Sequence, residues 1–204
     1  MSNVILHVVD DDLSVRQSLD QMIRRNGWQS QLFASAQEFL AAPRLPIPSC
    51  LIVDVKLPGL TGLDLQQRVA DHIPVIFITG FDDVPSMVRT LTATPIEFLT
   101  KPFSDEVLAS TIRAALERRQ MASEDEDRLR MLRDTYASLS RREQEVMALV
   151  VAGKLNKQVG GELGISEITV KAHRGRVMQK MRARTLPDLV MMAAKLQITA
   201  TGKS

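Results

Sequence analysis

The sequence has few of the features that mark disulfide-bonded or membrane proteins. Only one of its 204 residues is cysteine, and Cys50 lies inside an apolar run, so a disulfide framework within one chain is excluded. No apolar run approaches the roughly 18 residues that cross a bilayer. The chain enters Val4-Ile5-Leu6 without a basic region or cleavage site. We therefore expect a cytoplasmic protein without membrane association.

The formal net charge of +2 conceals an uneven distribution along the chain. Residues 1–119 hold 11 Lys and Arg against 14 Asp and Glu, residues 120–138 hold 3 against 5, and residues 139–204 hold 12 against 5. The net charges are therefore −3, −2 and +7. This division predicts two domains, 1–119 and 139–204, joined by a helical or flexible linker over 120–138, with a polyanionic partner for the second domain.

Short apolar runs alternate with helical patterns throughout the first 119 residues. This alternation is typical of repeated βαβ units, in which a parallel sheet is buried on both faces. We expect strands near residues 4–9, 29–33, 50–54, 75–79 and 96–100. Helix starts are indicated by Ser35 with Glu38 and by Ser104 after Pro102.

The last third of the chain predicts four short helices. Ser140 with Glu143 forms a capping box for the first, a Gly164 turn separates the second from the third, and Thr185 with Pro187 begins the fourth. This arrangement indicates a helix-turn-helix unit. Because residues 105–138 contain neither Gly nor Pro, the last helix of the first domain could continue into the linker, although a solvated acidic segment at 124–127 is an equal alternative.

Polar side chains follow several of the predicted strands. Neighbouring parallel strands converge on one crevice at their carboxyl ends, which is where such folds bind ligands. Three carboxylates close together repel one another unless a cation joins them, and Mg²⁺ suits oxygen ligands. A carboxylate can then accept a phosphoryl group as an aspartyl phosphate, while Lys and Thr side chains neutralise its oxygens. The set consists of Asp10, Asp11, Asp54, Thr79 and Lys101.

Several motifs, in order along the chain, carry a resemblance to a known family: Val8 to Asp12, Asp54 with Leu57-Pro58-Gly59 and Gly62, Ile78-Thr79-Gly80, and Phe98 to Phe103. Residues 3–119 resemble the receiver domain of two-component response regulators. The resemblance implies a doubly wound, five-stranded, flavodoxin-like α/β fold and phosphorylation of Asp54 by a sensor histidine kinase. It also implies Mg²⁺ at Asp10, Asp11 and Asp54, phosphoryl contacts from Thr79 and Lys101, and a switch that couples Thr79 to Phe98.

Two departures from the receiver pattern bear on signalling. Thr94-Pro95 stands where receivers usually carry Ala-Gly, and Phe81 replaces a small or polar residue. Both lie in the region through which a signal would pass. Phe81 could also shield an aspartyl phosphate from water.

The helix that begins at Ser166 is strongly basic. Six positive residues and no acidic residue fall between Lys171 and Arg184, while Val170, Val177 and Met181 keep core spacing. The outward face is thus basic and of a width that suits the major groove. Residues 139–196 resemble the LuxR/NarL helix-turn-helix, and the two halves together resemble FixJ-type response regulators. The resemblance implies base contacts from Lys171, Ala172 and Gly175 and backbone contacts from Asn156, Thr169, Arg174 and Arg176.

By this resemblance the protein is a transcription regulator rather than an enzyme. It is expected to be phosphorylated on Asp54, to form a homodimer, and to bind double-stranded DNA and RNA polymerase. One alternative is a phosphorylation-independent transcription factor whose receiver senses a partner. Another is a phosphatase, because Asp10-Asp11-Asp12 partly matches the haloacid-dehalogenase pattern of two Asp separated by one residue.

Overall fold

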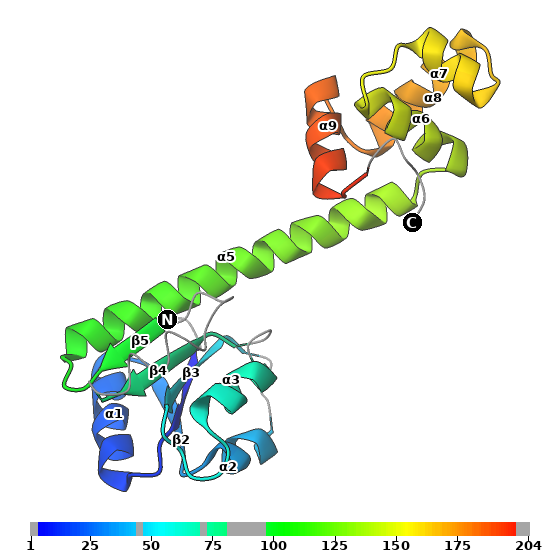
Figure 1. Cartoon of the computed structure of the whole chain (residues 1–204). Coiled ribbons are helices and arrows are strands. Elements are labelled where there is room, and N and C mark those ends of the chain that lie inside the picture. Colours follow the sequence, from blue (N-terminus) through cyan, green and yellow to red (C-terminus); the bar gives the residue numbers. More distant parts are fainter. Residues whose placement is uncertain (1–3, 44–46, 70–72, 81–96, 199–204) are drawn as a thin grey trace. The chain divides into compact units, whose positions relative to one another are not determined.

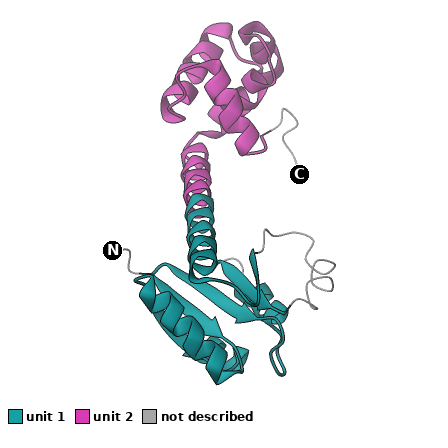
Figure 2. Ribbon diagram, turned by 90° about the vertical axis from the view of Figure 1, so that its left-hand side faces the viewer, with its two compact units in different colours: residues 1–122 teal, residues 123–204 magenta. Residues whose placement is uncertain are grey.

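The structure, a computed structural model, describes residues 4–43, 47–69, 73–80 and 97–198. The chain divides into two compact units, residues 1–122 and 123–204 (Figure 2). Among the helices of these described ranges, none combines the length and apolar character that a membrane span needs.

Five parallel strands form the sheet of the first unit (Figure 1). Their order is β2-β1-β3-β4-β5, which is that of a doubly wound, flavodoxin-like sheet. The predicted α/β fold and all five predicted strands are confirmed. The strand bounds are β1 Ile5–Val9, β2 Gln29–Phe33, β3 Ser49–Asp54, β4 Val75–Thr79 and β5 Glu97–Thr100.

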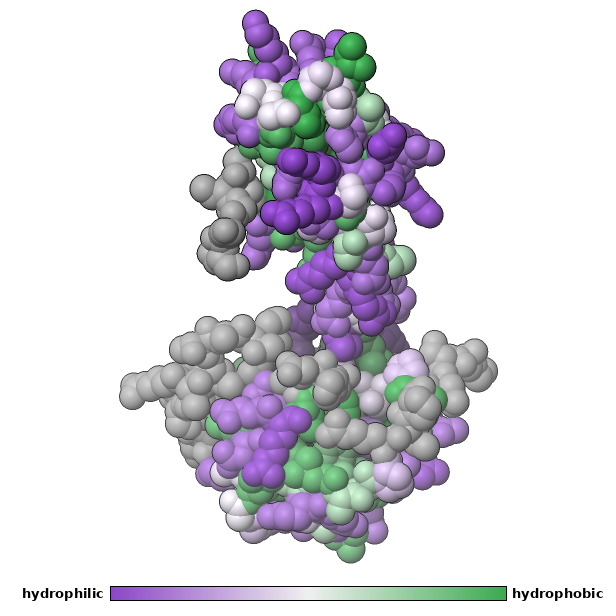
Figure 3. All heavy atoms as spheres, turned by 90° about the vertical axis from the view of Figure 1, so that its right-hand side faces the viewer, coloured by the Kyte–Doolittle hydropathy of each residue, from purple (hydrophilic) through white to green (hydrophobic). Residues whose placement is uncertain are grey.

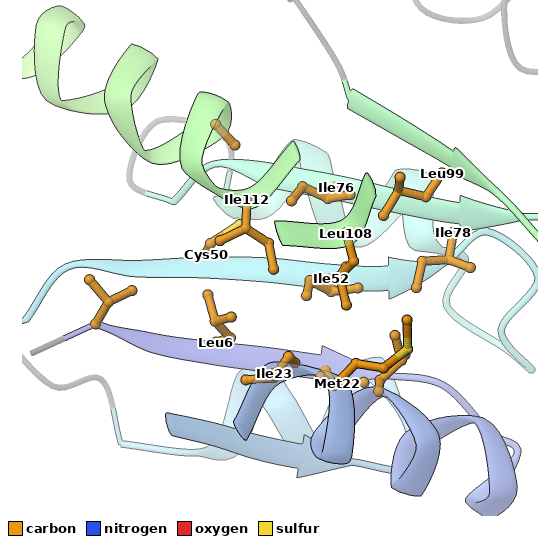
Figure 4. Close-up of a cluster of buried hydrophobic side chains, with 14 residues drawn as sticks. Leu6, Met22, Ile23, Cys50, Ile52, Ile76, Ile78, Leu99, Leu108 and Ile112 are labelled. Carbon is orange, nitrogen blue, oxygen red and sulfur yellow. The ribbon is translucent and has the colours of Figure 1, made fainter. Parts of the chain in front are cut away.

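Helices cover both faces of this sheet. On one face α1 (Leu13–Arg25) and α5 (Asp105–Ala137) enclose a cluster that includes Leu6, Ile52 and Ile112 (Figure 4). On the other, α2 (Ala36–Ala41) and α3 (Gly62–Val69) pack on Val9, Val53 and Phe77. Successive residues of a strand point to opposite faces, so the almost continuous apolar run Cys50–Val53 supplies both clusters.

The helix starts agree with the predicted caps. The Ser35 hydroxyl accepts from the Glu38 amide, and the Ser104 hydroxyl accepts from the Val107 amide. From the sequence we also expect a helix near residues 84–91, between the fourth and fifth strands. That segment lies outside the described residues, as do Phe81 and Thr94-Pro95. Helix α5 continues to Ala137, so the acidic segment 124–127 is helical.

The second unit contains four helices after α5: α6 (Arg141–Val151), α7 (Asn156–Leu163), α8 (Glu167–Lys180) and α9 (Leu186–Lys195). Ser140, Ser166 and Thr185 cap α6, α8 and α9 as the sequence predicts. Gly164 ends α7 with a φ of 65°, a left-handed conformation that glycine adopts without strain. The core joins residues of all four helices, among them Val146, Val159, Val177 and Leu189.

A close approach between α7 and the turn before α8 explains one of two adjacent glycines. A Cβ on Gly160 would lie 2.7 Å from the Ile165 carbonyl oxygen, whereas a Cβ on Gly161 would meet nothing within 4 Å. The close approach therefore accounts for Gly160 and not for Gly161.

Candidate functional site

Two carboxylates and one ammonium group meet at the carboxyl end of the sheet. Lys101 Nζ lies 3.4 Å from Asp10 Oδ2 and 3.2 Å from Asp54 Oδ1. The other Asp54 oxygen, Oδ2, accepts from the Lys56 backbone amide at 2.9 Å. Both oxygens of Asp54 are thus oriented, and the Asp54 side chain is 16% exposed. The carboxylate is fixed in position yet within reach of a small reactant.

The sheet itself produces this convergence. Asp10 follows β1, Asp54 ends β3 and Lys101 follows β5, and these parallel strands end together. Gly62 allows the loop after β3 to fold tightly back, because a Cβ at this position would lie 2.5 Å from the Asp54 carbonyl oxygen. The peptide bond between Lys101 and Pro102 is cis.

The negative charge of Asp10 is unfavourable because the side chain is buried. Asp10 is only 3% exposed, and burial raises the pKa of its carboxyl, with the nearby Asp54 charge acting in the same direction. The Asp12 amide and Lys101 oppose this rise. An additional cation would therefore be stabilised between Asp10 and Asp54, and two carboxylates are donors that suit Mg²⁺.

The third expected metal ligand is placed differently. Asp11 is exposed, and in the described ranges no three Asp, Glu, His or Cys side chains lie close enough to hold a metal ion as they stand. The donor chemistry fits Mg²⁺ at Asp10 and Asp54, whereas the Asp11 side chain would have to turn toward it.

The expected switch residues lie on adjacent strands. Thr79 at the end of β4 is 1% exposed, and its hydroxyl donates to the Gly80 carbonyl at 3.2 Å. Phe98 on β5 stacks on Phe77, with ring centroids 5.7 Å apart. The Lys101 amide donates to the Thr79 carbonyl at 2.9 Å, so the backbone of Thr79 is tied directly to that of Lys101.

Arg16 is a site residue that sequence reasoning missed. Its Nη1 donates to the Asp10 carbonyl at 2.6 Å and so holds the backbone from which the Asp10 and Asp11 side chains extend. A signal was available, because Arg16 lies in the first turn of α1, where the helix dipole disfavours a cation.

The basic helix α8 buries one face and exposes the other. Val170 and Val177 are buried, as predicted, while Lys171, Ala172, Gly175 and Arg176 are exposed. A Cβ on Gly175 would meet nothing within 4 Å, so no contact within the protein requires glycine there.

Three of the six expected basic side chains differ from the sequence-based prediction. Lys180 turns toward α6, where its Nζ lies 2.7 Å from Glu143 Oε2. Arg182 and Arg184 follow the end of α8 rather than belonging to it. The spacing alone could not reveal that Glu143, only 3% exposed, needs a cation.

Four of the expected backbone-contact or base-contact residues interact with neighbouring side chains. Arg174 Nη1 lies 3.3 Å from Asn156 Oδ1 and so connects α8 to the start of α7. The Thr169 hydroxyl lies 2.8 Å from that of Ser166, and Lys171 pairs with Glu167 at 3.2 Å. The Arg174 contact is partly buried and the other two are exposed; such contacts order the side chains while leaving them able to exchange partners.

Comparisons with known proteins agree with this architecture. The family model described as the response regulator receiver domain matches residues 6–113, and the one described as bacterial regulatory proteins, luxR family, matches residues 137–193. The chain therefore belongs to the two-component response regulators that join a receiver domain to a LuxR-family DNA-binding domain.

The similarity to individual relatives extends over almost the whole chain. Nodulation protein W of Bradyrhizobium diazoefficiens is 46% identical over 98% of this chain and 89% of its own, and the transcriptional regulatory protein FixJ of Rhizobium meliloti is 39% identical over 95% and 96%. Among solved structures, the response regulator StyR at low resolution shares 40% identity and a TM-score of 0.73 over 95% of this chain and 100% of that chain. Full-length FixJ from B. japonicum shares 35% identity and a TM-score of 0.57 over 97% and 98%.

Proposed function

We propose that Asp54 accepts a phosphoryl group from a sensor histidine kinase and that this modification controls DNA binding by α8. The observation that carries the proposal is the oriented Asp54 carboxylate, with Lys101 bridging it to the buried Asp10. This arrangement provides a nucleophile, a fixed cation and an anionic pocket at one edge of the sheet.

In the proposed step, an Asp54 oxygen attacks phosphorus. A bond forms between that oxygen and phosphorus while the bond from phosphorus to the donor breaks, and the donor leaves with the bonding electrons. Lys101 moves from bridging two carboxylates to neutralising phosphoryl oxygens, and the Thr79 hydroxyl exchanges its Gly80 carbonyl partner for one of them.

Mg²⁺ fits this site as a cofactor. When bound, it would neutralise charge on the carboxylates and on the transferred group. Asp10 and Asp54 would hold it, with Asp11 turning in as the third carboxylate. The Arg16 contact to the Asp10 carbonyl would keep the backbone of these ligands in place.

Phosphorylation can be tested with acetyl phosphate and Mg²⁺ as the reagents. We expect the wild-type chain to gain the mass of one phosphate, in an acid-stable and base-labile linkage. Asp54→Asn should gain none, because an amide has the carboxylate's shape but is not the acceptor nucleophile. Asp134→Asn, on the exposed surface of α5, is the matched control and should be labelled like the wild type. Labelling of Asp54→Asn would place the modification elsewhere.

The output of the switch is proposed to be a homodimer on double-stranded DNA. Occupation of the Thr79 hydroxyl by the phosphoryl group would bias Thr79 and Phe98 toward a second arrangement. Dimerisation then presents two α8 helices to two half-sites, and a DNA-bound dimer would act on RNA polymerase. Sedimentation should show a monomer that dimerises with acetyl phosphate. A monomer in both states, with DNA binding unchanged, would instead favour a receiver that works without phosphate.

A further inference from the structure

Ile168 is conspicuous on the surface of α8. It is 80% exposed, the largest value among the exposed large hydrophobic side chains of the described residues. Single exposed apolar residues are common and do not by themselves indicate a function. Figure 3 shows hydrophobic side chains among the hydrophilic ones on one face of the second unit. The position of Ile168 on its helix is therefore what matters.

Ile168 shares its face of α8 with the expected base-reading residues. Lys171, Ala172 and Gly175 follow it by three, four and seven residues, which is the spacing of one helix face, and all are exposed. The buried residues Val170 and Val177 lie on another face. Ile168 also lies in the first turn of the helix, and the N-terminal residues of a recognition helix are those that contact base edges.

The sizes of these side chains suit insertion of the helix into a groove. Ala172 is small, and the space around Gly175 is open, so the helix backbone can approach a partner closely at these two positions. Ile168 and Lys171 project further at the N-terminal end. A branched apolar side chain cannot form hydrogen bonds or ion pairs with phosphates or with the polar base edges. The apolar group that the major groove offers is the C5 methyl of thymine.

We infer that Ile168 is a specificity-determining residue that contacts a thymine methyl group in the recognised half-site. The inference rests on the proposed DNA-binding function of α8. It assigns a base preference to a position outside the set Lys171, Ala172 and Gly175.

The test uses a duplex selected from random sequences by the phosphorylated full-length chain. Each thymine is replaced singly by deoxyuridine, which removes only the methyl group. For the wild type, we expect one replacement in each half-site to weaken binding about fourfold, the effect of one buried methyl group. For Ile168→Ala, the same replacement should have no effect, and Ile168→Val should restore the sensitivity.

Two controls separate base reading from folding and from charge. Leu155 is 70% exposed at the start of α7, so Leu155→Ala removes a comparable apolar group and should keep the wild-type deoxyuridine profile. Ile168→Ala should leave the dependence of affinity on salt unchanged, whereas Arg176→Ala should reduce its slope by about 1. An identical deoxyuridine profile in wild type and Ile168→Ala would overturn the role of Ile168 alone. A wild-type chain that selects no sequence would overturn the DNA-binding proposal as well.

Discussion

A single buried carboxylate illustrates how function and stability oppose each other in the first unit. Asp10 is almost fully buried, yet it shares its cation, Lys101, with Asp54. A charge that would serve the proposed Mg²⁺ binding is thus unfavourable for the stability of the metal-free protein.

We predict that Asp10→Asn stabilises the metal-free receiver and weakens its affinity for Mg²⁺. The amide removes the buried charge and its repulsion of Asp54, while Lys101 keeps Asp54 as a partner. The gain should be about 1 kcal/mol, or roughly 4 °C in the unfolding midpoint of this unit. Thermal unfolding with and without Mg²⁺ measures both effects. Asp134→Asn should change neither, and a lower midpoint for metal-free Asp10→Asn would show that the charge is already compensated.

The residues of the site differ in how far the sequence could predict them. Asp10, Asp54 and Lys101 follow strands that the apolar runs mark clearly, so their convergence follows from sheet geometry. The Arg16 contact depends on a side-chain rotamer, and the direction of Lys180 depends on the buried Glu143 of another helix. Such contacts depend on tertiary packing, which periodicity does not encode.

At the scale of the element, α7 contains a natural comparison between two adjacent glycines. We predict that Gly161→Ala stabilises the second unit by about 1 kcal/mol, because alanine favours the helix and its Cβ meets open space. Gly160→Ala should destabilise it by about 1 to 2 kcal/mol, because the new Cβ would collide with the Ile165 carbonyl, which the backbone cannot easily move. Urea unfolding of both variants measures this difference. Equal changes in the free energy of unfolding for the two variants would mean that the backbone at Ile165 moves away to accommodate the new Cβ.

Helices α6 and α8 are joined by an ion pair with a defined dependence on pH. The Lys180 side chain, and then the Ser140 amide, hold the pKa of Glu143 below its ordinary value of 4.5. Because the folded pKa is lowered, the stability that Glu143 contributes is complete above pH 4.5 and is lost as the pH falls through the folded pKa.

We therefore predict that Glu143→Gln destabilises the second unit at pH 7 but has little effect at strongly acidic pH. Lys180 is 41% exposed and can return to water, so the loss should be about 1 to 2 kcal/mol. Glu145→Gln is the matched control, because Glu145 pairs with Arg141 and Arg142, which are exposed at the surface. Unfolding measured between pH 3 and 7 should separate the two variants. A pH-independent difference would assign the effect to packing rather than to charge.

The sequence could not decide whether the linker is helical or a solvated coil, and the reason is physical. Between Leu116 and Leu132, no residue of α5 belongs to a hydrophobic core cluster of either unit. Exposed pairs such as Arg128 with Asp125 and Arg130 with Asp127 support the helix there, and each contributes only a few tenths of a kcal/mol. Because this stretch packs against neither core, its sequence pattern fits a solvated coil as well as a helix.

At the scale of the whole molecule, the hydrophobic clusters of the first unit are separate from the cluster of the second unit. The chain passes from one unit to the other within the weakly supported part of α5. No described residue belongs both to a core cluster of the first unit and to that of the second, so we expect substitutions in one core to leave the stability of the other unchanged. We expect the proposed signal from Asp54 to reach α8 along this helix, through dimerisation, or both.

We predict that Glu126→Pro leaves both units folded but uncouples them. Proline removes a backbone hydrogen bond of α5 and clashes with the preceding turn, so we expect the helix to break in the stretch that neither core cluster supports. Phosphorylation at Asp54 should proceed as in the wild type, while the ratio of DNA affinities with and without acetyl phosphate falls toward one. Glu126→Ala removes the same carboxylate without breaking the helix and should keep the wild-type ratio. If Glu126→Pro also keeps it, helix continuity is not the path of the signal, and dimerisation alone carries it.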